Sequence, residues 1–446
     1  MMNRIVQLDG DHDEIFSGEI AQRIPYHRMN GKQYCLPAIT LFQPEEAGAI
    51  QAASESVDRI YRKVLRFAQQ YLPDEFLVQQ LGLHPALLSA ARMQVPCHGV
   101  SRQDWIINEH GMKCIENNTD TPTGIPETAY LAEHLIHTYT SFTAASIGMR
   151  KEIQSAFGQL IRHYAEQGLS GPIVFSSYGW HLEDRTNTEY LMQAVNELGY
   201  ETLYVPLEEL EIVPGDGLYA GGQRIAVLYR LYPLEYLIHD TDEEQGNMPI
   251  GEALIQLVVE GKLGLINPAQ SIITQSKGFM ALIWSLYARR DQTEEFVGFT
   301  LFDGTDIADI DRYLLPTYYE AAPFVQAGTP YVAKGYWGRE GKGTSLYDGE
   351  GQFKQAEWGH EEADVLEVQD YYDNQPKIYQ HMFPMQEAHV ETEEGSFDGY
   401  LLTGAYVIGG CYAGLLPRIG GKITGDMAYY CPAAITYTTQ GGSRRE

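Results

Sequence analysis

The sequence has few cysteines and lacks long apolar runs. Its five cysteines are scattered over 446 residues, and no two of them form a CxxC motif. This scarcity argues against a disulfide framework or a zinc knuckle and favours a reducing compartment. The uncharged stretch Ala281 to Ala288 is among the longer ones, whereas a membrane-spanning helix needs about 20 residues. The first residues contain no apolar signal-peptide core, so we expect a cytoplasmic protein with no membrane span.

Positive charge is also scarce. Lys and Arg together number 31, against 60 Asp and Glu, which gives a formal net charge of -29. Such a balance does not suit electrostatic binding to a phosphate backbone, so no nucleic-acid partner is expected. The acidic surplus suits a cationic substrate or bound metal ions, and it equally suits a solvated surface that keeps the protein soluble.

The remaining composition is that of a globular protein with a sizeable core. Hydrophobic residues make up 44% of the chain and charged residues 20%, and a chain of this length is expected to divide into packed parts. Residues 1–168 are expected to form helices and one hairpin, residues 169–266 alternating strands and helices, and residues 267–446 a helix followed by antiparallel strands. We therefore predict a mixed α/β fold with a parallel sheet in the middle part.

Hydrophobic periodicity gives the expected elements within these parts. Helices are predicted over residues 45–94 and 126–167, on either side of a hairpin at 98–118. A helix is also predicted from Ser276 to Ala288, because its apolar residues recur at helical spacing. The other predicted elements are a helix at 185–197 and strands at 172–175, 202–205, 225–229, 331–336, 365–369, 378–383, 400–408 and 411–416, the last two joined at Gly409-Gly410.

The predicted hairpin at 98–118 brings several oxygen-bearing side chains together. We interpret Glu109-His110-Gly111 as a three-residue loop, with Gly111 in the left-handed region, and this loop pairs Asn108 with Met112. Side chains alternate along a strand, so every second pair shares one face of the hairpin. The pairs expected on this shared face are Arg102 with Asn118 and Asp104 with Glu116.

Two carboxylates and an amide oxygen suit Mg²⁺, and an arginine beside them can hold a phosphate or carboxylate oxygen. An exposed hairpin with a cross-strand Arg–Asp ion pair needs the same residues and has no ligand. The pattern of the hairpin alone leaves both interpretations open.

Two further stretches combine glycines with polar residues. The run from Thr119 to Glu127 leads into a helix start, which suits anion binding by free N–H groups and equally suits ordinary capping. The run from Tyr331 to Thr344 is a strand that carries Lys334 and ends in a glycine-rich basic loop. It does not match a P-loop, since Tyr336 and Gly343 occupy positions that need Gly and Ser or Thr. Such a loop can cover a triphosphate through its N–H groups, or it can be a tight turn.

In this order, the pieces resemble the glutathionylspermidine synthase family. That family has an R-x-D hairpin strand, then E-x-N-x-D-[TS]-x-[TS], then [NS]-K at a helix start. A strand-borne lysine with G-R-x-G, an I-Y-Q hinge and a hairpin closing on arginine follow. The matching residues are Arg102-Gln103-Asp104, Glu116 to Thr123, Ser276-Lys277, Lys334 with Gly338-Arg339-Glu340-Gly341, Ile378-Tyr379-Gln380, and Arg418. The resemblance covers roughly residues 98–432.

The resemblance implies a circularly permuted ATP-grasp fold with an associated pre-ATP-grasp α/β subdomain, because Glu116 and Asn118 precede both lysines. Under this interpretation, residues 1–168 carry the metal-ligand hairpin of the core. Residues 169–266 form the pre-ATP-grasp-like subdomain, and residues 267–446 form the nucleotide-binding part with a glycine-rich lid.

The resemblance also implies two cofactors, ATP and Mg²⁺, and a role for each site residue. The metal ligands are Asp104, Glu116 and Asn118. The ATP-binding residues are Lys277 and Lys334 at the phosphates, Gly341 in the lid, and Tyr379 and Gln380 at the adenine hinge. The residues that steady the acid substrate and the charge of phosphoryl transfer are Arg102, Arg339 and Arg418. Thr121 and Thr123 lie near the peptide substrate, and Glu183 and Asp184 resemble a family acidic segment that meets the amine.

The implied activity is an ATP-dependent ligase that joins a small or peptide-like acid to an amine through an acyl phosphate. Phosphoryl transfer depends on charge neutralisation and positioning, which metal, lysine and arginine supply, and the sequence has no G-x-S-x-G elbow. We expect a short member without an amidase domain, in which Gly335 follows Lys334 where the family usually has proline. The acid and the amine therefore stay open. Two alternatives are a catalytically silent nucleotide- or peptide-binding relative and an ATP-dependent kinase that uses the same cradle.

Overall fold

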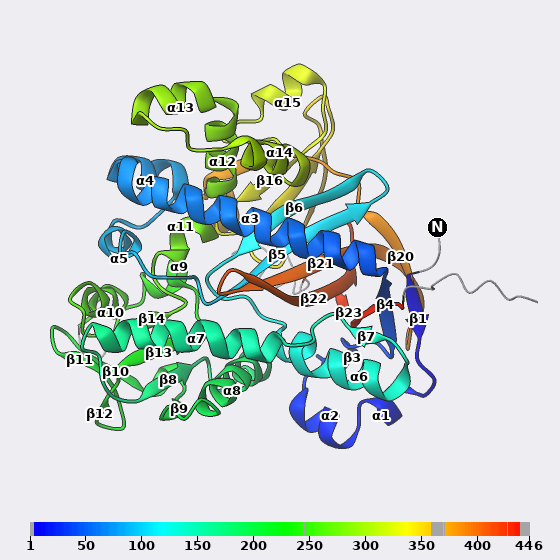
Figure 1. The fold of residues 1–446 in the computed structure, drawn as a ribbon, viewed down its shortest axis with the longest axis horizontal. Helices are drawn as coiled ribbons and strands as arrows, with labels where there is room; N and C mark the ends of the chain where they lie inside the picture. Colours follow the sequence, from blue (N-terminus) through cyan, green and yellow to red (C-terminus); the bar gives the residue numbers. More distant parts are fainter. Residues whose placement is uncertain (1–3, 244–245, 358–368, 370, 426, 438–446) are drawn as a thin grey trace, which may run out of the picture.

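One sheet of six strands joins the early and the late parts of the chain (Figure 1). The computed structural model describes residues 4–243, 246–357, 369, 371–425 and 427–437. In this sheet, β21 pairs with β5 on one side and with β22 on the other, both antiparallel. Its strands are β5 (Val100–Asn108), β6 (Gly111–Asn118), β20 (Gln386–Thr392), β21 (Gly395–Ile408), β22 (Cys411–Gly420) and β23 (Tyr429–Tyr430).

The long helix α3 (Pro44–Tyr71) runs across one face of this sheet (Figure 1). Pro44 occupies its first turn, and Ile50, Val57 and Val64 lie on its buried face. Gln103 of β5 donates to the backbone oxygen of Ser54 in α3, at 3.0 Å. Because side chains alternate along β5, its other face carries Arg102 and Asp104 into the cavity described below.

The register of the β5–β6 hairpin confirms part of the prediction and corrects the rest. Arg102 is opposite Asn118 and Asp104 is opposite Glu116, as predicted. Asn108, however, pairs with Gly111 and not with Met112, so the turn has two residues rather than three. A β-bulge beyond Asp104 adds one residue to β6 and restores the register. The predicted loop was therefore one residue too long. The bulge compensates for this difference, so the pairs Arg102–Asn118 and Asp104–Glu116 are as predicted.

A parallel sheet of four strands forms the α/β unit, as predicted from the alternating pattern. The order of its strands is β14-β13-β8-β9, so the chain leaves β8 toward β9 on one side, and β13 later pairs on the other side. Ligands bind at such a switch point, at the carboxyl ends of the strands. The elements of this unit include β8 (Ile173–Ser176), α8 (Leu182–Asn196), β9 (Thr202–Tyr204), β13 (Val227–Arg230) and β14 (Gly264–Ile266).

A third sheet of five antiparallel strands carries the second predicted lysine. Its order is β15-β19-β16-β17-β18, and α12 (Gly278–Ala288) packs against β15 and β19. The predicted strand at 365–369 falls outside the described residues except for Gln369. The strands are β15 (Thr317–Tyr318), β16 (Tyr331–Gly335), β17 (Thr344–Tyr347), β18 (Phe353–Glu357) and β19 (Lys377–His381). Of these, β15, β17 and β18 were not predicted.

A small sheet of order β1-β4-β24-β7 contains strands from both the first and the last part of the chain. β24 (Ala433–Ile435) pairs in parallel with β4 (Ala38–Phe42). The first and third predicted parts thus share two sheets, whereas residues 169–266 hold all four strands of the parallel sheet. The mixed α/β fold is confirmed, and the division into three parts stays a prediction. No helix within the described ranges is long and apolar enough to cross a bilayer.

The remaining elements complete the layers around these sheets. The helices are α1 (His12–Ile15), α2 (Gly18–Arg23), α4 (Asp74–Leu81), α5 (Leu88–Ala91), the π-helix η2 (Glu127–Leu131), α6 (Ala132–Tyr139), α7 (Met149–Glu166), the 3₁₀-helices η1 (Pro85–Leu87) and η3 (Leu207–Glu209), α9 (Leu234–Leu237), α10 (Ile250–Val259), α11 (Ser271–Gln275), α13 (Arg290–Val297), α14 (Gly304–Tyr313) and α15 (Ala322–Ala327). The short strands are β1 (Ile5–Gln7), β2 (Arg28–Met29), β3 (Lys32–Gln33), β7 (Thr143–Ala144), β10 (Leu210–Val213), β11 (Gly217–Ala220) and β12 (Gln223–Arg224).

Candidate functional site

A cavity of about 620 Å³ is lined by residues of the six-stranded sheet, the five-stranded sheet and the α/β unit. Of the fifteen predicted site residues, thirteen line it: Arg102, Asp104, Glu116, Asn118, Thr121, Thr123, Glu183, Asp184, Lys334, Arg339, Gly341, Gln380 and Arg418. These residues come from widely separated parts of the sequence. The fold therefore brings the predicted motifs to one place.

Asp104 lies between two arginines on the floor of the cavity. Its carboxylate accepts from Arg102 Nε at 2.9 Å and from Arg418 Nη2 at 2.7 Å. Burial alone would raise the pKa of Asp104, but the two guanidinium groups outweigh it and lower the pKa to about 2. Asp104 is therefore ionised at neutral pH and fixes the direction of both arginines.

Glu116 and Asn118 of β6 also line the cavity. Glu116 Oε1 accepts from Lys277 Nζ at 2.9 Å, and Lys277 donates further to the backbone oxygen of Gly338. Lys277 precedes α12, is buried and does not itself line the cavity. It thus lies behind Glu116 and beside the glycine-rich loop, where it links the hairpin to that loop.

Lys334 of β16 reaches the hairpin through the bulge. Its ammonium group donates to the backbone oxygen of Ile115 at 2.9 Å and to Gln380 Oε1 at 2.8 Å. Ile115 is the extra residue of the bulge, so no residue of β5 stands opposite it. Burial lowers the pKa of Lys334 to about 8. The lysine therefore loses part of its charge just above neutral pH.

The shifted pKa of Lys334 leads to a testable pH dependence. A bound phosphate favours the ammonium form, so ATP binding should raise the pKa of Lys334 and take up a proton near pH 8. The affinity for ATP should accordingly fall as the pH rises from 7 to 9. Calorimetric titration in two buffers of different ionisation enthalpy measures the proton uptake. Lys334→Arg stays charged over this range and should abolish that uptake; equal uptake in both proteins would refute the assignment.

Arg339 ties the glycine-rich loop to the α/β unit. Its guanidinium group donates to Glu235 Oε1, with Nε at 2.8 Å, and to Thr121 Oγ1 at 3.0 Å. Gly341 has a φ of 74°, and a Cβ on it would lie 2.7 Å from the backbone oxygen of Thr424. Glycine is thus required there by both conformation and space. That ATP orders the loop over its phosphates stays a prediction.

Hydrogen bonds hold the segment from Thr123 to Ile125 against Arg102 and helix α8. The backbone oxygen of Thr123 accepts from Arg102 Nη1 at 3.0 Å. Asn187 of α8 accepts through Oδ1 from the N–H groups of Gly124 and Ile125, at 3.1 and 3.0 Å. Because Glu183 and Asp184 lie in the first turn of the same helix, their position relative to Thr123 is fixed.

The acidic side chains at this end of the cavity have shifted pKa values. Burial, and then the nearby charges of Glu127 and Asp184, raise the pKa of Glu183 to about 8. Glu127 is fully buried and accepts from Tyr26 at 2.9 Å and from Tyr34 at 3.0 Å. Burial raises its pKa as well. This group of carboxylates is suited to a positively charged ligand, which would stabilise their ionised forms.

The side chain of a second predicted residue lies outside the cavity lining, and several residues near the site had no predicted role. Tyr379 was expected at the adenine hinge, but its side chain does not line the cavity and packs edge-on against Tyr331, with ring centroids 5.9 Å apart. Asp120 lay within a recognised motif without an assigned role, and it forms a fully buried ion pair with Arg230. Glu127 stood at the end of the same run, whereas nothing in the sequence singled out Tyr34.

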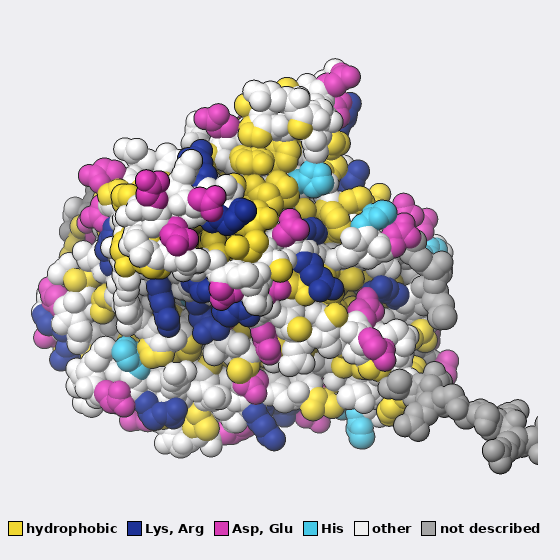
Figure 2. Space-filling view, turned by 45° about the horizontal axis from the view of Figure 1, so that its top comes forward, with side chains coloured by type: hydrophobic (Ala, Val, Ile, Leu, Met, Phe, Trp, Pro, Cys, Tyr) yellow, Lys and Arg dark blue, Asp and Glu magenta, His cyan; other side chains and the backbone are white. Residues whose placement is uncertain are grey.

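The three arginines on the cavity floor were expected to steady the acid substrate and the charge of phosphoryl transfer. In the structure each is paired with a carboxylate: Arg102 and Arg418 share Asp104, and Arg339 pairs with Glu235. The floor is thus partly neutralised before any ligand binds. Over the face seen in Figure 2 the charge is uneven, since Lys and Arg side chains gather near its middle, with Asp and Glu around them.

Comparisons with known proteins give a family and several relatives. A family model described as "Glutathionylspermidine synthase preATP-grasp" matches residues 20–436. A Haemophilus influenzae protein provisionally named as an acid–amine ligase is 21% identical over 339 residues, covering 74% of this chain and 73% of its own. A structure provisionally named gamma-glutamylcysteine synthetase, from Methylobacillus flagellatus KT, has a TM-score of 0.40 at 9% identity and covers 86% of this chain and 88% of its own. The ATP-grasp ligase PsnB, complexed with precursor peptide PsnA2 and AMPPNP, has a TM-score of 0.23 at 9% identity, covering 59% and 87%.

Proposed function

Because this chain belongs to the glutathionylspermidine synthase preATP-grasp family, we propose that it is an ATP- and Mg²⁺-dependent ligase that joins a peptide-like carboxylate to an amine. One observation carries the proposal. A carboxylate, an amide, a lysine and three arginines from distant motifs line the same cavity. This combination suits phosphoryl transfer to a carboxylate, since that reaction depends on positioning and charge stabilisation.

Glu116 and Asn118 fit a magnesium ion because they present hard oxygen donors to the cavity. Mg²⁺ bound there with ATP would supply charge neutralisation at the phosphate oxygens. Asp104 belongs to the same proposed ligand set, but its oxygens already accept from Arg102 and Arg418. We infer that its larger role is to hold these two arginines toward the acid substrate.

The two lysines have different roles in this proposal. Lys334 donates to two neutral oxygens, which leaves its third N–H for a phosphate oxygen of ATP. Lys277 donates to Glu116 and to the backbone oxygen of Gly338 in the glycine-rich loop. Bound phosphates would therefore interact with Lys277 through Glu116 and this loop. The adenine would lie along β19, where Gln380 lines the cavity.

The arginines and the acidic end of the cavity would then serve the two chemical steps. Arg102 and Arg418 would hold the carboxylate while its oxygen bonds to the γ-phosphorus and the bond to ADP breaks, giving an acyl phosphate. The amine nitrogen would then attack the acyl carbon, and phosphate would leave. Glu183, whose pKa is raised by burial, would take in its ionised form the proton that an ammonium group loses before this attack.

The experiment is a screen of small peptides and acids against amines, read as ADP release and as product mass. We expect ADP release that needs Mg²⁺ and increases when acid and amine are both present, together with a product of the mass of the amide. A stable phosphorylated product without an amide would indicate a kinase. Absence of ADP release with every pair would contradict the ligase and leave a nucleotide-binding relative.

A further inference from the structure

Four aromatic side chains extend from the acidic end of the cavity along the α/β unit. Tyr178 and Trp180 lie in the loop after β8, Tyr232 follows β13, and Tyr236 lies in α9. The ring centroids of Tyr178 are 5.5 Å from those of Trp180 and 5.4 Å from those of Tyr232. Tyr232 and Tyr236 follow at 6.5 Å. We call these four residues the aromatic row.

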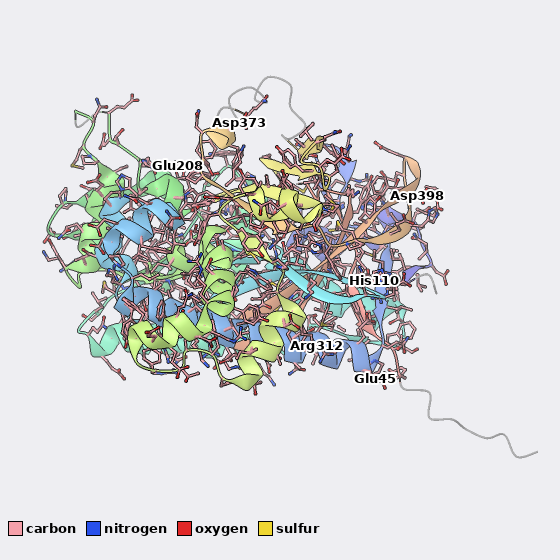
Figure 3. The ribbon with its side chains drawn as sticks, turned by 90° about the horizontal axis from the view of Figure 1, so that it is seen from above. Glu45, His110, Glu208, Arg312, Asp373 and Asp398 are labelled. Atoms are coloured by element: carbon pink, nitrogen blue, oxygen red, sulfur yellow. The ribbon has the colours of Figure 1, made fainter. Side chains whose placement is uncertain are left out.

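The aromatic row lies at the switch point of the parallel sheet. The loops after β8 and β13 leave the carboxyl ends of two neighbouring strands, and the chain turns from these strands to opposite sides. A crevice between such loops is where open α/β sheets bind ligands. Glu208, which follows β9 at the same edge of the sheet, lies along one side of the molecule in Figure 3.

The row touches the lining of the cavity at two points. Trp180 packs edge-on against His181, with ring centroids 5.6 Å apart, and His181 lines the cavity. At the other end, the guanidinium carbon of Arg339 lies 5.8 Å from the ring centroid of Tyr236. The four residues of the row do not themselves line the cavity, but the row adjoins its lining at both of these points.

The row includes an exposed ring, and two buried polar atoms near it have no hydrogen-bond partner within the described part of the chain. The Trp180 side chain is 73% exposed, an unusual degree for so large an apolar ring. Ser176 Oγ, at the end of β8, and Glu235 Oε2, beside Tyr236, are buried and have no hydrogen-bond partner within the described part of the chain. Buried polar atoms usually have a partner, so each such exception calls for one.

The charges around the row decide what kind of ligand suits it. Glu235 is already paired with Arg339, and Asp184 lies 3.3 Å from His181. The hydroxyl of Tyr232 donates to Asp240 at 3.1 Å. A second positive charge on the row would be repelled by the guanidinium group of Arg339, whose carbon lies 5.8 Å from the ring centroid of Tyr236. The Trp180 ring, which is largely exposed, remains available to an apolar or aromatic group.

We propose that the aromatic row is a specificity subsite for the amine substrate, and that the amine carries an aromatic or extended apolar group beyond its reacting nitrogen. This inference rests on the proposed function. The ammonium group would lie at Glu183 and Asp184, in the first turn of α8. Because His181 is the N-cap residue of that helix and contacts Trp180, the other end of the amine would extend onto the row.

The test compares two amines with the same acid, 2-phenylethylamine and propylamine. We expect Trp180→Ala to lower kcat/KM for 2-phenylethylamine about tenfold, the effect of one lost aromatic contact and its burial. The value for propylamine should change less than twofold, and Trp180→Phe should restore most of the loss. Phe296→Ala is the matched control, because Phe296 on α13 is 76% exposed and lies outside the cavity lining.

A binding measurement separates this inference from the proposed function. Titrating 2-phenylethylamine without ATP should change the tryptophan fluorescence of the native protein and not that of Trp180→Phe. If this change occurs but no amide forms with any acid, the subsite stands and the ligase assignment fails. If amides form but Trp180→Ala affects both amines equally or neither, the subsite is refuted. A larger loss of kcat/KM in Trp180→Ala for 1,3-diaminopropane than for 2-phenylethylamine would also refute the subsite, since a second cation would then occupy the row.

Discussion

Replacing Glu116 by glutamine should reduce turnover about 10³-fold, the scale on which a preorganised charge in a phosphoryl-transfer site acts. Glu116 presents its carboxylate to the cavity and accepts from Lys277 at 2.9 Å. The variant removes a negative donor for Mg²⁺ and leaves Lys277 without its ionic partner. ADP release measured across a range of Mg²⁺ concentrations should show both a lower maximum and half-saturation at a higher Mg²⁺ concentration, because metal binding is weaker.

The fold should tolerate this substitution, because the Glu116 side chain is 24% exposed and glutamine keeps its shape. Glu109→Gln is the matched control: it changes the same residue type in the exposed turn of the same hairpin, next to the labelled His110 in Figure 3. This control should have native kinetics. Native kinetics in Glu116→Gln as well would remove Glu116 from the site.

Replacing Asp120 by asparagine should destabilise the protein by about 3–5 kcal/mol, the usual result of breaking a buried ion pair. Asp120 and Arg230 have fully buried side chains, and Asp120 Oδ1 accepts from Arg230 Nη2 at 2.5 Å. Asp120 Oδ2 also accepts from the N–H of Leu234 at 3.0 Å. The variant leaves the charge of Arg230 buried without its carboxylate. Urea denaturation followed by circular dichroism measures the loss.

Glu197→Gln provides the comparison, since it breaks the exposed ion pair with Arg150 at a similar distance of 2.7 Å. Exposed pairs contribute about 0–1 kcal/mol, so this variant should be nearly as stable as the native protein. The double variant Asp120→Leu with Arg230→Met should recover much of the stability, because neither charge remains buried. A loss in Asp120→Asn no larger than in Glu197→Gln would contradict the structural role of this pair.

The site could be predicted from the sequence to the extent that its residues occur in local patterns. Arg102 and Asp104 alternate on one strand, and Glu116 and Asn118 on the next, so period two places each pair on one face of its strand, and the predicted register brings the two pairs together. The predicted register held at these residues only because the bulge at Ile115 offset the shorter turn. A bulge has no signal in hydrophobic alternation, so the sequence could not have revealed this cancellation.

The rest of the site depends on contacts between distant parts of the chain. Glu235 pairs with Arg339 across more than one hundred positions, and no spacing rule relates them. The aromatic row is similar, since Trp180 lies in the loop after β8 and Tyr236 in α9, and only the strand order of the parallel sheet brings these elements together. Strand order is a tertiary property, whereas sequence periodicity reports the faces of single elements.

The strand pairing of the six-stranded sheet also determines how long one edge of β5 stays unpaired during synthesis on the ribosome. β5 and β6 are complete at Asn118, but their partner β21 begins only at Gly395, so the edge of β5 has no partner until residues 119–394 have been translated. At about 5–20 residues per second, this interval is on the order of 15–60 s. An unpaired β-edge is prone to pair with another chain. We therefore expect chaperones to bind the nascent protein during this interval. Slower translation between the β5–β6 and β21–β22 hairpins should lower the yield of native enzyme.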